Sequence, residues 1–205
     1  VVVTSAALIL ALAMGSIVNG MSAYVVPLEK LHGWNRADVS LINVAGIIGL
    51  AFGGLAMGAI ADRIGTRPVV MVGGAVMSSA YLISALADQL WQFYALMFFA
   101  GFFGAAGIFA PIMSLVGKWF PIGAGLAIGI ASAGQALGQG GVPYASAFLI
   151  KEFGVSWAFA FTGSLMLVIL IPLATLLKPA NILSGSQGSA THENGYPPLT
   201  LVVPT

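Results

Sequence analysis

The chain has 205 residues with a formal net charge of +1; 59% of them are hydrophobic and 6% are charged, against about 25% charged residues in soluble domains. A soluble chain of this length buries only about 70% of its unfolded surface, and the remaining surface would here be apolar, so the composition excludes a water-soluble domain and predicts an integral membrane protein. The seven Lys and Arg residues are scattered, which argues against the clustered basic surface that nucleic-acid binding requires.

Uncharged apolar stretches of about 19–29 residues alternate with short charged connections along the chain, and roughly 20 apolar residues in a helix cross the hydrocarbon of a bilayer. Barrel strands are shorter and alternate in polarity, which these stretches do not. We therefore predict an all-α, polytopic bundle over residues 1–178. The expected transmembrane helices cover residues 5–28, 39–61, 69–87, 91–117, 122–150 and 156–177.

The orientation of the chain in the membrane is predicted from the basic residues of its loops. Six spans with short loops place both ends of the six-helix region on one side, and the even-to-odd loops with the tail carry slightly more Lys and Arg than the odd-to-even loops. The positive-inside rule then places both termini in the cytoplasm, and we expect a bacterial inner membrane. Residues 179–205 are rich in Ser, Gly, Thr and Pro, which predicts a flexible polar tail or a linker between two halves.

Few polar side chains interrupt the predicted spans. Burying an amide in hydrocarbon without a partner costs several kcal/mol, so such groups face another helix or a wet cavity. Two interpretations stay open, a hydrogen bond between helices and a place in the wall of a substrate cavity. The candidates for the cavity wall are Asn19 and Tyr24 in the first span and Gln135 and Gln139 in the fifth.

The fifth span is unusually rich in glycine. Small residues let helices approach closely in a membrane, which is one interpretation of the pattern. Glycine and proline together also favour a bent or broken helix, and in transporters such helices tend to line the substrate path. The candidates for helix bending are Gly134, Gly138 and Pro143.

The second loop carries the most specific motif. From Gly58 to Pro68 it reads GAIADRIGTRP and resembles the signature loop of the major facilitator superfamily, with Thr66 where the family usually has a basic residue. Gly65 permits a left-handed turn, and Asp62 can meet a neighbouring helix N-terminus or Arg67. The resemblance implies a cytoplasmic gating loop formed by Gly58, Asp62, Arg63, Gly65 and Arg67.

Two further segments, YVVPLEKLHGWNRADVS from Tyr24 and KWFPIGAGLAIGIASAG from Lys118, resemble the monocarboxylate transporter and oxalate:formate antiporter branch of that family. The chain departs from the branch at residues 122–124, where basic residues are usual, and at Val155 and Ser156, where Trp and Arg are usual. The resemblance implies the N-terminal half of a major-facilitator fold, with a 3+3 inverted repeat. It also implies a secondary transporter of mono- or dicarboxylate-type organic anions that works by alternating access.

Two other functions stay open, a six-helix sensor or partner subunit that transports nothing and a half-carrier that dimerises. The expected partners are a small-molecule substrate, the lipid bilayer and a second six-helix half, either in the same polypeptide beyond Thr205 or in a second chain. We expect no cofactor, no metal site and no enzyme, because the chain has no Cys, shows no catalytic triad or metal-ligand spacing, and places His32 and His192 in a loop and in the tail.

Overall fold

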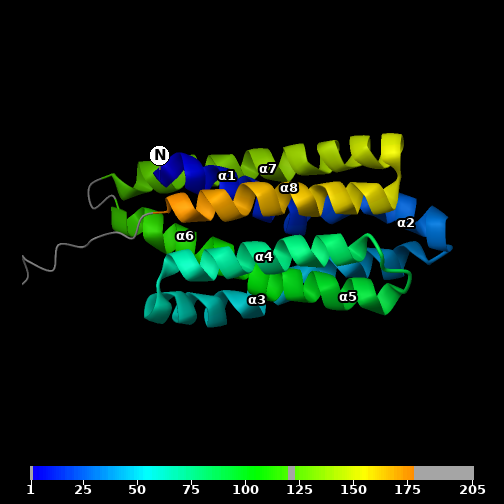
Figure 1. Cartoon of the computed structure of the whole chain (residues 1–205), viewed down its shortest axis with the longest axis horizontal. Coiled ribbons are helices and arrows are strands. Elements are labelled where there is room, and N and C mark those ends of the chain that lie inside the picture. The colour runs from blue at the N-terminus through cyan, green and yellow to red at the C-terminus, as the bar shows by residue number, and fades with distance from the viewer. Residues whose placement is uncertain (1, 120–122, 178–205) are drawn as a thin grey trace, which may run out of the picture.

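The computed structural model describes residues 2–119 and 123–177, and the regular elements in these ranges are helices. They form rods that run back and forth along one long axis (Figure 1). The first rod contains α1 (Val2–Met14), the π-helical segment η1 (Gly15–Asn19), the 3-10 segment η2 (Gly20–Tyr24) and α2 (Val25–His32). The second rod is α3 (Arg36–Ile64) and the third is α4 (Thr66–Ser84). The fourth rod contains α5 (Leu90–Phe99), the π-helical segment η3 (Ala100–Ala105) and α6 (Ala106–Trp119). The fifth rod is α7 (Ala124–Phe153) and the sixth is α8 (Val155–Leu176).

The rods suit a membrane in length and composition. Five of those described are long and apolar enough to cross one: Val3–His32, Arg36–Ile64, Thr66–Ser84, Leu90–Trp119 and Val155–Leu176. α7 has 30 residues, which is ample length, but glycines and two glutamines lower its hydropathy and it is not among these five. The prediction of an all-α, polytopic bundle is confirmed. Ile122, at the expected start of the fifth span, and the predicted tail at 179–205 lie outside the described residues.

Single glycines make two of the turns. α3 and α4 are separated by Gly65 alone, with φ +94° and ψ 157°, and α7 and α8 by Gly154 alone, with φ +89° and ψ 170°. This backbone region is open almost only to glycine. The second and third rods are therefore joined in the same way as the fifth and sixth.

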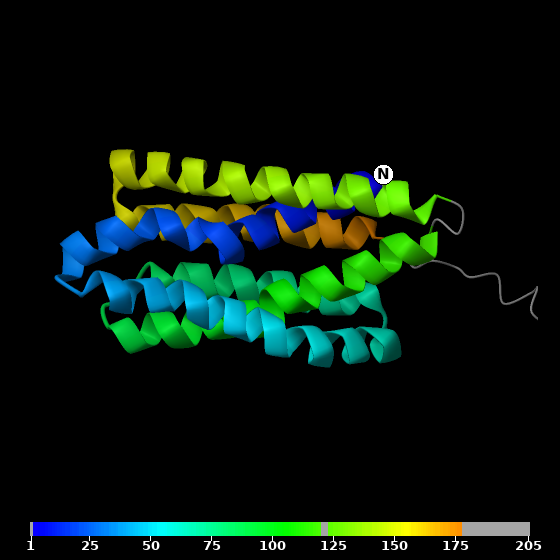
Figure 2. The same cartoon turned by 180° about the vertical axis from the view of Figure 1, so that it is seen from behind.

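The rods form two layers. α4 and α8 pack against each other and lie in front in Figure 1, whereas α7, α1 and α3 lie on the opposite side, with α6 among them (Figure 2). We call the side of α7, the first rod and α3 the open face. In the first and fourth rods 56% of the most apolar window is buried, against 28% in α3, so these two rods form the centre of the bundle.

The packing follows a repeating pattern. The first rod packs on the fifth, the fourth packs on the second, and the third packs on the sixth. Both central rods also contain a π-helical segment. These contacts match when the first, second and third rods are paired with the fourth, fifth and sixth, because the first contact then becomes the second and the third becomes itself. The chain is thus organised as two matched units of three rods, which is the arrangement expected of one half of a major-facilitator fold.

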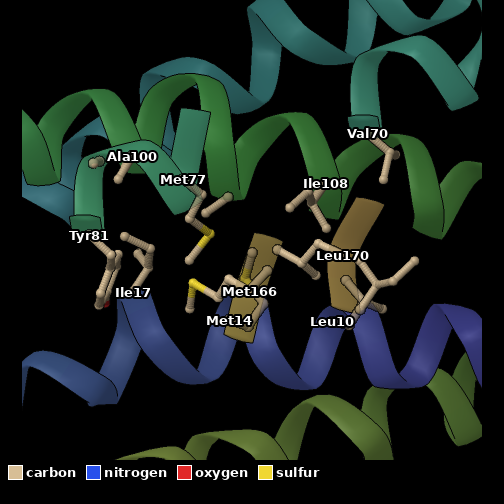
Figure 3. Packing of buried hydrophobic residues seen from close by; sticks show 14 of the residues in the cluster. Leu10, Met14, Ile17, Val70, Met77, Tyr81, Ala100, Ile108, Met166 and Leu170 are labelled. Carbon is tan, nitrogen blue, oxygen red and sulfur yellow. The ribbon is translucent and has the colours of Figure 1, made fainter. Parts of the chain in front are cut away.

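The core between the layers is apolar and contains several methionines. Leu10 and Met14 of α1 meet Met77 of α4 and Met166 and Leu170 of α8, and each is at most 2% exposed (Figure 3). Methionine is unbranched and polarisable, so it fills irregular gaps between helices.

Candidate functional site

The helices of the open face cross at glycines. A Cβ atom on Gly138 of α7 would overlap the backbone of Ala11 in α1, and one on Gly134 would lie 2.6 Å from Ala7 Cβ. The equivalent crossing of the fourth rod on α3 brings Gly101 onto the carbonyl of Gly46. These contacts leave no room for a side chain, so glycine is required for the backbones to approach.

The glycines of α7 therefore have a packing role, and α7 itself is one continuous helix that runs through Pro143. Departures from α-helical geometry occur instead in the first and fourth rods, at η1 and η3, beside the two glycine crossings. The bending of α7 at Gly134, Gly138 and Pro143 stays a prediction.

The break in the first rod changes from π-helical to 3-10 geometry at Asn19, which has φ −120° and ψ −18°. Side chains bind three carbonyl groups there: Tyr81 Oη donates to Ser16 O at 2.9 Å, Asn43 Nδ2 to Val18 O at 3.3 Å, and Ser22 Oγ to Asn19 O at 2.6 Å. A bilayer offers no hydrogen bonds to irregular backbone, so Asn43 of α3 and Tyr81 of α4 supply some of the hydrogen bonds that a regular helix would form within itself.

The break places Asn19 on the open face. Its side chain is exposed, and Asn19 Nδ2 donates to Gln139 O of α7 at 3.3 Å. The preceding residue, Val18, is held by α3, so Asn19 lies between the two outer helices of this face. Gln135 and Gln139 are half-buried one turn apart on α7. Two of the four predicted cavity-wall residues, Asn19 and Gln139, are thus directly joined although they are distant in sequence.

Tyr24 occupies a different place. It has no exposed surface, and its ring stacks on Phe159 of α8 with centroids 4.0 Å apart. Its hydroxyl lies beside those of Ser146 and Thr162, but no atom of the described residues completes a hydrogen bond with it. Tyr24 therefore lies inside the bundle rather than on the open face.

Sequence reasoning passed over two residues that support this break. Asn43 is the one amide in the second predicted span and Tyr81 is the one tyrosine in the third. An amide or a phenol in a span whose other polar residues are serines was the available signal, because such a group needs a partner on another helix.

The predicted gating loop lies at the end of the bundle where the chain starts (Figure 1). Asp62 is in the last turn of α3, and its Oδ1 is 3.5 Å from Lys118 Nζ near the end of α6. The partner of Asp62 is thus a lysine of the fourth rod, whereas the sequence suggested Arg67 or a helix N-terminus. Arg63 and Arg67 are exposed, and a Cβ on Gly58 would make only ordinary contact with Ala110, at 3.9 Å.

Both members of this ion pair are largely exposed, with side chains 51% exposed at Lys118 and 69% at Asp62. Water screens such a pair, so it contributes at most about 1 kcal/mol to stability. The ion pair therefore links the ends of the second and fourth rods, and little free energy is needed to break it.

Comparison with known proteins gives a family and several relatives. A model of the Major Facilitator Superfamily matches residues 6–199. The oxalate:formate antiporter of Oxalobacter formigenes is 31% identical over 134 residues, which are 64% of this chain and 30% of that protein. Monocarboxylate transporter 11 of Homo sapiens is 34% identical over 121 residues, 59% of this chain and 26% of that protein.

A third relative is the probable anion transporter 2, chloroplastic, of Oryza sativa subsp. japonica. It is 31% identical over 147 residues, which are 71% of this chain and 28% of that protein. The chain spans less than a third of the length of each of these three relatives.

Proposed function

Because the chain belongs to the Major Facilitator Superfamily, we propose that it is the N-terminal six-helix half of a secondary transporter that moves small organic anions by alternating access. The relatives named above are transporters, and their names specify oxalate and formate, monocarboxylates and anions. These names support a substrate that carries one or two carboxylates.

The observation that carries this proposal is the polar break in the first rod. An exposed asparagine in the middle of an apolar bundle needs water, a ligand or another protein beside it. Asn19 is held at such a place by the backbone of Gln139. The amides of Asn19, Gln135 and Gln139 can donate N–H groups to carboxylate oxygens, and we assign these three to the cavity wall. We assign Tyr24 to the support of the wall from behind.

A second six-helix half would complete the cavity. Added Cβ atoms at four glycines of α7, namely Gly125, Gly129, Gly140 and Gly141, would meet nothing within 4 Å. These positions leave the backbone of α7 open to close approach by another helix. The second half belongs either to the same polypeptide or to a second chain; a half-carrier that dimerises is the alternative, and crosslinking in native membranes would separate the two.

The ion pair between Asp62 and Lys118 is the proposed latch at the cytoplasmic end, with Gly58, Arg63, Gly65 and Arg67 around it. The two exposed arginines would meet the second half when that end closes. Both ends of the six-helix region then lie in the cytoplasm. In the same cycle, α7 would move against α1 at the crossing made by Gly134 and Gly138. α7 would bend at Pro143, which lies inside the helix.

The latch is tested by uptake of labelled oxalate, formate and lactate into vesicles that carry the transporter containing this chain. Asp62→Ala should abolish uptake and leave the amount of protein in the membrane unchanged. The matched control is Asp88→Ala, an exposed acid at the opposite end of the bundle, which should transport normally. Unchanged uptake in Asp62→Ala would remove the latch from the proposal.

The cavity wall is tested in the same vesicles. Asn19→Ala should lower uptake at subsaturating substrate, whereas Ser79→Ala should not. Ser79 is an exposed hydroxyl in the opposite layer, and in the described part of the chain it donates to Ala75 O of its own helix. Equal uptake by both variants would exclude Asn19 from the substrate path. Binding of none of these anions by the wild-type protein would favour the non-transporting sensor.

A further inference from the structure

A groove of about 680 Å³ lies at the end of the bundle opposite Asp62, between α2 and the turn that joins α7 to α8. One wall is the face of α2 that carries Pro27, Lys30 and Leu31. The other wall is formed by Ile150, Phe153, Gly154, Val155, Ser156 and Trp157. The proposed transport mechanism uses none of these residues.

The groove lies at the level where hydrocarbon meets lipid headgroups. The first membrane-spanning rod ends at His32 and the last begins at Val155, so both walls are at span ends. Trp157 and Trp91 are 71% and 63% exposed and both begin rods at this end of the bundle. Exposed tryptophans at span ends form the aromatic belt of membrane proteins. We therefore place the mouth of the groove at the level of the lipid headgroups.

The chemistry of the lining has two parts. Lys30 is the one charged residue among the lining residues, it is exposed, and it forms no ion pair within the described part of the chain. Beside it, Leu31, Phe153 and Trp157 are 60%, 63% and 71% exposed. A cation next to a broad apolar wall is complementary to a phosphate that carries an acyl chain.

From this arrangement we propose that the groove binds a phospholipid, with its phosphate on Lys30 Nζ and one acyl chain against Leu31, Phe153 and Trp157. A free phosphate ion would leave the apolar wall in water. α2 and α7 border the open face, but Trp157 belongs to α8 in the opposite layer (Figure 1), so a second six-helix half on the open face would leave the acyl-chain contact at Trp157 uncovered. The site would hold the α7–α8 turn against α2 at this end.

The test is native mass spectrometry of the delipidated protein titrated with dioleoylphosphatidylglycerol. Lys30→Ala should weaken binding of the first lipid about fivefold, the change expected for one lysine at a lipid surface. The matched control is Lys151→Ala, which removes an exposed lysine at the same end that does not line the groove; its affinity should equal that of the wild type. Equal weakening in both variants would mean general charge attraction and would overturn the proposal.

Two further ligands test the phosphate contact and the acyl-chain contact separately. Dioleoylglycerol, which has the chains without the phosphate, should bind weakly and equally to wild type and Lys30→Ala. Inorganic phosphate at millimolar concentration should not displace the phospholipid; displacement would show that a free anion occupies the groove. Trp157→Ala should weaken phospholipid binding more than Trp91→Ala, and the reverse order would place the acyl chain elsewhere.

Discussion

The glycine crossing of α1 and α7 gives a prediction whose size can be worked out from the structure. In Gly138→Ala the new Cβ overlaps the backbone of Ala11, and a backbone cannot turn away as a side chain would. α1 and α7 must then separate by roughly 1 Å, and a gap of that size removes a quarter to a half of the dispersion energy of the atoms that lose contact. Overpacking of this kind costs about 1–3 kcal/mol.

A matched variant isolates that cost. Gly140 lies two residues further along α7, and a Cβ there would meet nothing within 4 Å. Both substitutions gain the same intrinsic preference of alanine for a helix, about 1 kcal/mol, so this gain cancels in the comparison. We expect Gly140→Ala to be more stable than wild type and Gly138→Ala to be about 1–3 kcal/mol less stable than Gly140→Ala.

The assay is equilibrium unfolding of the purified chain in mixed micelles of increasing SDS fraction, followed by tryptophan fluorescence. The difference in free energy of unfolding between the two variants is the quantity to measure. Equal stability of the two variants, or a more stable Gly138→Ala, would refute the inference that this crossing is closed to a methyl group.

Two other predictions concern polar groups. Tyr81→Phe should lose about 0.5–1.5 kcal/mol of stability, because it removes the hydrogen bond to Ser16 O at the break. Tyr24→Phe should be nearly neutral, because that hydroxyl has no partner among the described residues. Unfolding in SDS measures the stability of both variants, and a larger loss in Tyr24→Phe than in Tyr81→Phe would contradict the assignment. Lys118→Ala should change stability by at most about 1 kcal/mol yet lower uptake as strongly as Asp62→Ala, and normal uptake by Lys118→Ala would show that the ion pair is not the latch.

Much of the architecture follows from the sequence because its signals are local. The bilayer demands long uncharged helices, and charged residues and glycines mark where the rods end, as at Gly65 and Gly154. The motif from Gly58 to Pro68 was enough to indicate the family, because it resembles the signature loop of that family along its whole length.

The site depended on the tertiary structure. Asn19 and Gln139 are joined because the break in the first rod turns one side chain toward the backbone of α7, and composition does not show which helix lies beside which. The same holds for Tyr81 and Asn43, which bind carbonyls that a regular helix would have used itself. Hydropathy along the chain was sufficient to show that it crosses a membrane and roughly where. It could not show which polar groups meet, because hydrogen bonds between rods depend on the register and rotation of each helix, and the glycine crossings set both.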